Sequence, residues 1–417
     1  MSLGVIDGTL TLTLDVFGTF ALCAVIYLLS TVLGKKVKLI QKLGVPAIVV
    51  TGVAYSILYT IFTSLGIFTI VADQTLSDTL FLFFFTTVGF GTVIDKKMMK
   101  SGGKLLVILF FAEGLWLFVQ EMIAMGVGGG LLGMPYPIAF LCGPATMMGG
   151  IPSGVAWGTK IEAAGLAGAV GIGVAAGAIG QIMGGFLGAP VAKKLFIEKH
   201  KLSANDDVVV SEETVIVKEE KREFNMLHLA KQILYFGIVV SVGLVLRNWF
   251  MEVTGFYVLD FIGSMILAII LVNVNEKVHF MDVDQKFMSM LGDASLNFFI
   301  AMSFLSLNLV DLKNLIGPTL IVMVLQAIAI ILFCIFLFKI LGKTYDLAVI
   351  LAGFIGHGLG NVTTAFANMD TLSEEYGKSR VAYVIVPMLG ACLIDVFDIP
   401  LESIAYNLAM SLQGLIP

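Results

Sequence analysis

Clusters of glycine, proline and hydroxyl side chains interrupt two apolar stretches of this 417-residue chain, at 142–157 and at 352–365. Neither stretch can form a smooth membrane-spanning helix, because broken backbone at membrane depth is tolerated only where protein buries it or where it lines a cavity. Helix N-termini at such breaks carry partial positive charge and unpaired N–H groups that bind anions. Unwound carbonyls and hydroxyls can ligate a hard cation such as sodium. Two such stretches at corresponding places in the two halves of a chain are typical of a transporter's binding site.

The candidate ligand-binding residues lie in these two stretches. Glycine lets backbone approach a ligand closely, and Ser, Thr and Asn add donors and acceptors. The predicted substrate-binding residues are Gly149, Gly150, Ser153, Gly154, Gly358, Gly360, Asn361, Thr363 and Thr364. The alternative is that such glycines only permit tight helix crossings. We prefer that alternative for the glycine-rich stretch 165–188.

Ionisable side chains inside apolar stretches are functional candidates, since charge is costly in a membrane. Asp395 is predicted to ligate sodium or accept a proton, and Asp293 shares a helical face with Asn297. Glu113 interrupts another apolar stretch, where it is either functional or a structural hydrogen-bond acceptor. His357 lies inside the second interrupted stretch, as a proton donor, a substrate contact or a packed neutral histidine.

The composition indicates a polytopic membrane protein. The chain is 58% hydrophobic and 13% charged, which is too little charge to cover the surface of a soluble domain of this size. The net charge of -5 arises from loop residues and indicates no nucleic-acid partner. The four cysteines are single and far apart, so they are predicted to be small core residues and not metal ligands.

The predicted fold class is an all-α membrane protein with ten spans of about 20 residues each. The predicted spans are 12–33, 45–67, 77–94, 104–127, 164–191, 230–250, 256–274, 288–309, 315–340 and 381–409, the last with a bend at Pro400. Re-entrant hairpins are predicted at 137–159 and 346–368. The charged stretch 192–229 is predicted to be a solvated cytoplasmic linker.

Basic residues favour the cytoplasmic side of a membrane. With the N-terminus outside and both hairpins re-entrant, all but three of the 25 Lys and Arg residues face the cytoplasm. The three exceptions are Lys160, Arg247 and Lys313. This bias predicts five spans and one hairpin per half, with both termini outside.

Five is an odd number of spans, so the second half must be inverted relative to the first. The predicted domains are a first repeat, 1–191, the linker, 192–229, and a second repeat, 230–417. The order of elements supports the repeat: in each half a phenylalanine-containing span, an acidic turn and a long apolar span precede the glycine-rich segment. Inverted repeats of this kind are a transporter feature.

The chain resembles the bacterial sodium/glutamate symporter family over nearly its whole length. The matching residues are Gly149-Gly150, Gly154, Ala156 and Trp157; Ala352-Gly353, Gly356, Gly358-Leu359-Gly360, Thr364-Ala365 and Ala367-Asn368-Met369; Val386-Pro387-Met388, Gly390-Ala391 and Ile394-Asp395; and Pro46, Gly292 and Ser295. The resemblance implies an elevator-type transporter with two inverted five-span repeats. It also implies a homodimer in the bacterial cytoplasmic membrane.

The expected coupling ion is sodium, with Asp395, Thr146, Asn368 and Asp293 as its expected ligands. The expected substrate is glutamate or a related small carboxylate. The first hairpin departs from the family pattern Ser-Gly-Gly-His-Gly-Thr-Gly, because it reads Met148-Gly149-Gly150-Ile151-Pro152-Ser153-Gly154. In the second hairpin, Asn361 replaces a small apolar residue and Thr363 replaces a proline. These changes bear on substrate identity more than on the fold.

Our leading hypothesis is therefore sodium-driven symport of glutamate or a related carboxylate by a protein that is not an enzyme. The alternative is proton-coupled transport of another small organic anion on the same fold, through Asp395 or Asp293. A channel would require a continuous polar stripe along several spans, whereas the polar clusters here are short. An intramembrane aspartyl protease would need two facing aspartates, and Asp395 has no evident partner in the sequence.

Overall fold

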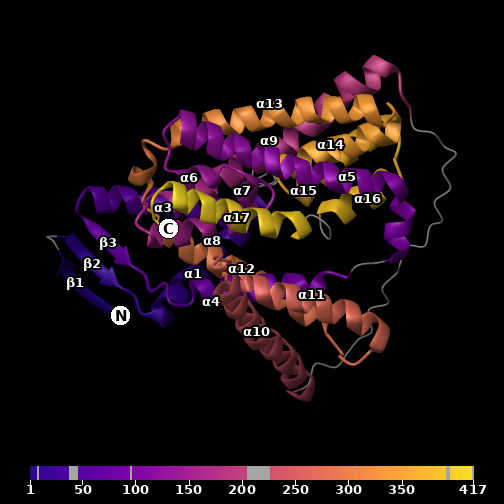
Figure 1. Ribbon diagram of the computed structural model, residues 1–417. Coiled ribbons are helices and arrows are strands. Elements are labelled where there is room, and N and C mark those ends of the chain that lie inside the picture. Colours follow the sequence, from indigo (N-terminus) through magenta and orange to yellow (C-terminus); the bar gives the residue numbers. More distant parts are fainter. Residues whose placement is uncertain are drawn as a thin grey trace.

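The computed structural model describes residues 1–6, 9–36, 46–93, 96–203, 226–305, 307–390 and 395–415, without the side chains of residues 96–102, 311, 395 and 396. The chain is predominantly helical (Figure 1). The elements of the first half are β1 (Ser2–Ile6), β2 (Thr9–Thr13), α1 (Val16–Lys36), α3 (Ala47–Ser64), β3 (Phe68–Val71), α4 (Ser77–Gly91), α5 (Lys96–Ile123), η1 (Ala124–Leu131), α6 (Tyr136–Phe140), α7 (Pro144–Met147), α8 (Gly150–Ala163), α9 (Ala169–Ala192) and η2 (Lys193–Glu198). Those of the second half are α10 (Met226–Thr254), α11 (Phe261–Val278), α12 (Gln285–Leu305), η3 (Leu309–Leu312), α13 (Ile316–Leu341), α14 (Tyr345–Leu359), α15 (Val362–Tyr376), α16 (Ala382–Met388) and α17 (Asp395–Leu412).

Eight helical segments in the described part of the chain are long and apolar enough to cross a bilayer. They coincide with eight of the ten predicted spans. The predicted span 77–94 is the shorter apolar helix α4, Ser77–Gly91. Within the described residues, α16 and α17 cover the predicted span 381–409. Pro400 lies inside α17, and the bend expected at this proline stays a prediction.

Both predicted hairpin segments are broken helices, and their re-entry into the membrane stays a prediction. The first consists of α6, α7 and α8, separated by turns at residues 141–143 and 148–149. The second consists of α14 and α15, separated at Gly360 and Asn361. The predicted linker begins within helical structure, because η2 continues α9 to Glu198. Its acidic and basic clusters at 204–222 lie outside the described residues.

A small sheet at the N-terminus corrects the prediction of a purely helical fold. β1 pairs with β2 in antiparallel fashion, and β2 pairs with β3 in parallel. The strands are rich in Thr, Val, Ile and Phe, which favour extended backbone. The pairing Leu10–Phe68 joins the segment before α1 to the segment after α3. These strands were missed because they are short and adjoin strongly apolar helices.

The helices form two groups, and each half of the chain contributes to both (Figure 1). The first helical group contains α1, α3, α4, α10, α11 and α12. Within it, α4 packs on both α11 and α12, α3 packs on α1 and α12, and α10 packs on α11. The second helical group contains α5 to α9 and α13 to α17, including both hairpins. In Figure 1 the second group is the upper part of the molecule and the first group is the lower part.

A limited set of contacts joins the two helical groups. Lys160 of α8 donates to Asp78 of α4 over 2.7 Å. On another face, Asn407 of α17 exchanges two hydrogen bonds with the backbone of Tyr257, which precedes α11. A cavity of about 630 Å³ separates the start of α4 and the end of α12 from the α8–α9 turn. The boundary therefore combines polar contacts and a cavity with apolar packing, in which one buried cluster contains residues of both groups.

Helix α9 packs against both hairpins through glycine. A Cβ built on Gly173 would lie 2.3 Å from the carbonyl oxygen of Gly154 in α8. A Cβ built on Gly188 would lie 2.3 Å from the carbonyl oxygen of Ala352 in α14. Real Cβ atoms do not approach so closely, so these positions permit main-chain contact only as glycine. The interpretation of stretch 165–188 as a helix-crossing surface is confirmed.

The α9 contacts predict a position-specific loss of stability. In Gly184→Ala the new methyl would lie 2.6 Å from the carbonyl oxygen of Gly356, so the helices must separate. We expect this overpacking to cost about 1–3 kcal/mol and to lower the thermal unfolding midpoint of the detergent-purified protein. Gly237→Ala is the control, because nothing lies within 4 Å of its Cβ position on α10. Equal midpoints for both variants would contradict the proposed packing.

Candidate functional site

The breaks of the two hairpins lie against the same part of α9. A Cβ on Gly177 would be 3.1 Å from the backbone nitrogen of Ile151, at the start of α8. A Cβ on Gly180 would be 2.4 Å from the carbonyl oxygen of Leu359, at the end of α14. Both contacts lie within one turn of α9, which has about 3.6 residues per turn. The two interrupted stretches, far apart in sequence, are thus brought together.

The first break ends where α8 begins. Gly150 has φ +75°, a left-handed conformation that favours glycine. The Cβ position of Gly154 lies 2.6 Å from Cγ2 of Thr146 and 2.9 Å from the carbonyl oxygen of Gly173, so Gly154 is a packing position. Gly149 and Pro152 are half-buried, whereas Ser153 is buried. Of these residues, only Gly149 and Pro152 are therefore partly accessible at the start of α8.

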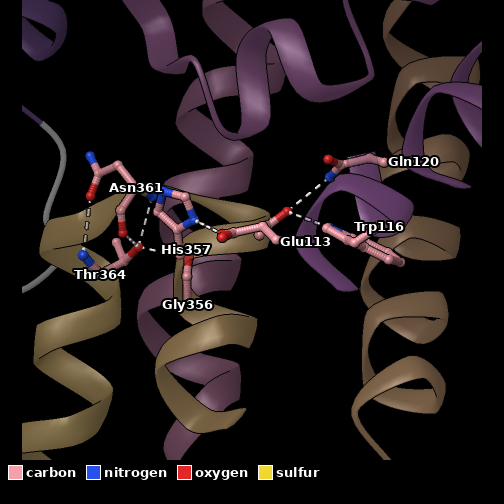
Figure 2. A network of polar contacts seen from close by, with 8 residues as sticks. Glu113, Trp116, Gln120, Gly356, His357, Asn361 and Thr364 are labelled. Atoms are coloured by element: carbon pink, nitrogen blue, oxygen red, sulfur yellow. Dashed lines mark hydrogen bonds and ion pairs between the residues drawn. The ribbon is translucent and has the colours of Figure 1, made fainter. Parts of the chain in front are cut away.

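The second break is closed by a capping box at the start of α15 (Figure 2). Asn361 Oδ1 accepts from the Thr364 backbone N–H at 3.1 Å, and Thr364 Oγ1 accepts from the Asn361 N–H at 2.9 Å. The same hydroxyl lies 2.8 Å from the carbonyl oxygen of Gly356, to which it can donate. This cap satisfies backbone groups that a helix start leaves unpaired. Thr363 is exposed next to the cap.

One face of α5 holds the end of α14 (Figure 2). Gln120 Nε2 donates to the carbonyl oxygen of Gly358 at 2.8 Å, and Trp116 Nε1 lies 3.4 Å from the same oxygen. One turn earlier on α5, Glu113 Oε1 lies 2.8 Å from His357 Nδ1. The Gln120 and Trp116 contacts satisfy the carbonyl of Gly358, which a helix end would otherwise leave unpaired inside the membrane.

Two buried glutamines connect the hairpins to each other. Gln120 Nε2 is also 3.2 Å from Sδ of Met147, so Gln120 contacts both breaks. Gln326 of α13 donates to the backbone oxygens of Gln120, at 2.8 Å, and Cys142, at 3.3 Å. Sequence reasoning missed both glutamines, although a glutamine inside an apolar span is itself a signal.

The first hairpin is also tied to α17. Trp157 Nε1 donates to Glu402 Oε2 at 2.7 Å. The Trp157 ring packs against Phe140 and Tyr406, with centroids 5.4 and 4.6 Å apart. Trp157 and Glu402 are both buried, so this bond fixes α8 against the last helix of the chain.

Asn368 joins α15 to α9 through its side-chain amide. Its Nδ2 donates to the carbonyl oxygens of Gly184 and Thr364, each at 2.7 Å, and its Oδ1 accepts from the Ala189 N–H at 2.6 Å. The side chain is buried. Asn368 was predicted as a sodium ligand, and the structure gives it a further role as a bridge between helices.

The other expected sodium ligands are spread over the fold. Thr146 is buried in α7, and its Oγ1 donates to the Leu141 carbonyl oxygen at 2.6 Å. Asp293 is exposed on α12, in the first helical group, away from the hairpins. Asp395 is the first residue of α17, and its side chain lies outside the described residues. Of the three whose side chains the structure describes, Asp293 therefore lies in a different helical group from Thr146 and Asn368.

Oxygen atoms other than carboxylates are available near the breaks. The Oε1 atoms of Gln120, Gln181 and Gln326 are buried without a hydrogen-bond partner among the described residues. The backbone of Gln181 lies beside Gly360. The described part of the chain contains no group of three or more His, Cys, Asp or Glu residues that could hold a metal ion. A cation at the breaks could use amide, hydroxyl and carbonyl oxygens together with single carboxylates, such as that of Glu121, whose oxygens are also buried without a partner among the described residues.

Electrostatically, the breaks depend on helix ends. Neither α14–α15 nor α6–α9 contains an Arg, and Lys160 is the only Lys among these helices. The N-termini of α8 and α15 therefore provide the positive potential for an anion. Apolar helices of bilayer length surround two broken helices, and the helix starts that follow the two breaks lie at the same part of α9. This arrangement defines a multi-pass membrane transporter.

Comparison with known proteins agrees with this class. The sodium/glutamate symporter family matches residues 12–378. The sodium/glutamate symporters of Escherichia coli (strain K12) and Shigella flexneri are each 32% identical to this chain over 393 residues, which is 92% of this chain and 96% of theirs. That of Haemophilus influenzae is 30% identical over 400 residues, 94% of this chain and 98% of its own length. No solved structure matches the chain.

The chain belongs to the sodium/glutamate symporter family, and it is a transporter and not an enzyme. The family resemblance drawn from the glycine-rich motifs is thus confirmed.

The hydrogen bonds of Asn368 predict that it stabilises the fold without sodium. We expect Asn368→Ala to lower the thermal midpoint in sodium-free buffer, because each buried backbone group left unpaired costs about 1–3 kcal/mol. Asn297→Ala is the control, because its amide bonds only within its own helix, to the Asp293 carbonyl oxygen. Destabilisation confined to sodium-containing buffer would instead assign Asn368 to cation binding alone.

Proposed function

We propose that this chain carries glutamate or a related small carboxylate across the bacterial cytoplasmic membrane in symport with sodium. The observation that carries the proposal is the meeting of the two hairpin breaks on α9, where Gly177 contacts Ile151 and Gly180 contacts Leu359. The names of the relatives, sodium/glutamate symporters, support the choice of substrate and ion.

In this proposal the carboxylate is held by helix N-termini and hydroxyl groups. The first turns of α8 and α15 supply backbone N–H groups, and Ser153, Asn361 and Thr363 supply side-chain groups. Gly149 and Gly150 let the substrate approach the backbone of the first hairpin. Gly154, Gly358, Gly360 and Thr364 act indirectly, because they pack or cap the helices that present those groups.

Sodium is proposed to bind through oxygen atoms near the same breaks. Thr146 and Asn368 retain acceptor lone pairs beside the bonds described above. Asp395 would add a carboxylate from the start of α17. The proposed site leaves out Asp293, which is exposed on α12 in the first helical group.

The proposed architecture is that of two inverted repeats, 1–191 and 230–417, joined by the linker 192–229. The packing of α4 on α11 and α12, matched by that of α12 on α3, supports this arrangement, since α4 and α12 are the third described helices of their halves. The crossed bonds of Gln120 and Gln326 support it too, because each comes from the helix before its own hairpin and reaches the other hairpin.

The proposed transport mechanism is of the elevator type, in which the second helical group moves against the first. The hollowed boundary between the groups supports this mechanism. We further propose a homodimer with its contact on the first group, as the family resemblance implies. Both termini would lie outside the cell; Figure 1 marks them at the same end of the molecule.

The first test is uptake of labelled glutamate into proteoliposomes. We expect accumulation under an inward sodium gradient and little without it, because the free energy of accumulation comes from sodium entry. An inward potassium gradient is the control, and unlabelled aspartate and dicarboxylates are the competitors. Folded protein that takes up no glutamate under the sodium gradient would contradict this substrate.

A second prediction concerns the proposed substrate contacts. Thr363→Ala and Ser153→Ala should each raise the apparent KM about two- to tenfold, equivalent to one hydrogen bond of about 0.5–1.5 kcal/mol. Thr371→Ala is the matched control, because Thr371 is exposed two turns further along α15 and bonds only to the Ala367 carbonyl oxygen. An unchanged KM in both site variants would place the substrate elsewhere.

A further inference from the structure

Glu113 and His357 form a buried acid–base pair beside the second break (Figure 2). Glu113 Oε1 and His357 Nδ1 are 2.8 Å apart. The side chains are only 3% and 5% exposed. His357 lies in the last turn of α14, one residue before the Gly358 carbonyl held by Gln120. The pair therefore sits next to the proposed carboxylate site without belonging to its cap.

The other carboxyl oxygen of Glu113 is the second feature of the pair. Glu113 Oε2 is buried without a hydrogen-bond partner among the described residues. Glu113 and His357 both line a cavity of about 10 Å³. Its other lining residues are apolar: Ile350, Phe354, Val386 and Leu389. Such a space holds at most one water molecule, and its side chains offer one carboxyl and one imidazole, so it suits a proton better than a metal cation.

Several ionisable groups lie on the helices packed around the pair. Helix α17 packs on α5, with Phe397 against Gly114 next to Glu113, and carries Asp395, Asp398, Glu402 and Tyr406. Helices α7 and α9 carry none. On α5, Glu121 lies about two turns beyond Glu113, against Gly143 of the first hairpin. The other groups on the helices around His357 are Tyr345 and Asp346 at the start of α14, Cys334 and Lys339 of α13, Asp370, Glu374, Glu375 and Tyr376 of α15, Tyr383 of α16 and those of η2. Cys334 is buried, and the charged groups of α13 and α15 are exposed towards the helix ends remote from the break.

Charge balance in this setting restricts the protonation states. With no added proton, a carboxylate beside a neutral imidazole leaves one buried negative charge, which is unfavourable in a low-dielectric interior. One added proton makes the pair neutral, as carboxylate–imidazolium or acid–imidazole. A second proton makes it positive. That positive charge is stabilised by the C-terminal end of α14 and by an anion at the adjacent break.

We infer that Glu113–His357 is a proton-binding site that takes up its second proton together with the anionic substrate. The proton comes from water on the side of substrate entry, forms an O–H bond at Glu113 Oε2, and returns to water when the substrate leaves. The transporter then moves a proton in addition to sodium. This inference rests on the proposed function.

Proton movement can be measured in proteoliposomes that enclose a pH-sensitive dye. We expect internal acidification when external glutamate and sodium are both present. Glu113→Gln and His357→Gln should lose the acidification while retaining sodium-driven uptake at a reduced rate, because both variants preserve side-chain size and polarity. His228→Gln is the matched control: His228 makes a similar 2.8 Å contact with Asp284, remote from the hairpins, and acidification should persist.

The outcomes separate this inference from the proposed function. Sodium-driven glutamate uptake without acidification in the wild type, or acidification that persists in both variants, would overturn the proton site and leave the symport proposal standing. If the wild type shows no sodium-driven uptake, the symport proposal fails and a second measurement judges the pair. That measurement is nitrogen NMR of the four histidines in detergent, titrated from about pH 5 to about pH 8. A His357 signal that titrates identically in wild type and Glu113→Gln overturns the proton site; a shifted titration supports it.

Discussion

Every backbone N–H and C=O group inside a bilayer must find a partner within the protein, and this constraint explains the polar side chains of the second helical group. The breaks at 141–149 and 360–361 release groups from the helical ladder. Gln120 binds the carbonyl of Gly358, Gln326 binds that of Cys142, and the Asn361–Thr364 cap closes α15. The polar residues in these apolar helices are thus hydrogen-bond partners of the broken backbone. A ligand at the breaks would compete with these existing hydrogen bonds.

Close approach to α9 makes this arrangement possible. Gly173, Gly184 and Gly188 allow α8 and α14 to contact α9 main chain to main chain. The Asn368 amide then bonds to α9 and α15 at once. Because no side chain separates these backbones, both hairpins and α9 form one packed unit, in which a displacement of one hairpin is transmitted to the other.

Much of this fold was predictable from the sequence. The lengths of the apolar stretches predicted most of the spans. Clusters of Gly, Pro and hydroxyl residues predicted both hairpins, because these residues disfavour continuous helix. The partners across helices were not predictable: nothing local to Gln120 indicates that it faces Gly358, since helix rotation depends on all neighbouring packing. Asp293 illustrates the same limit, because its helical face was evident but its distance from the hairpins was not. The short strands β1 to β3 depend on a pairing between 10–13 and 68–71 that no local pattern reveals.

Helix α9 contains no ionisable residue between Ala169 and Ala192. Moving such a helix through hydrocarbon has no Born penalty, whereas each bare charge would add several kcal/mol. The element that holds both hairpins therefore carries no formal charge, and a membrane voltage acts on it only through its helix dipole. Voltage sensitivity of the transport cycle would then come mainly from the bound ions and from the ionisable groups of other helices, such as Glu113 of α5 and Lys160 of α8.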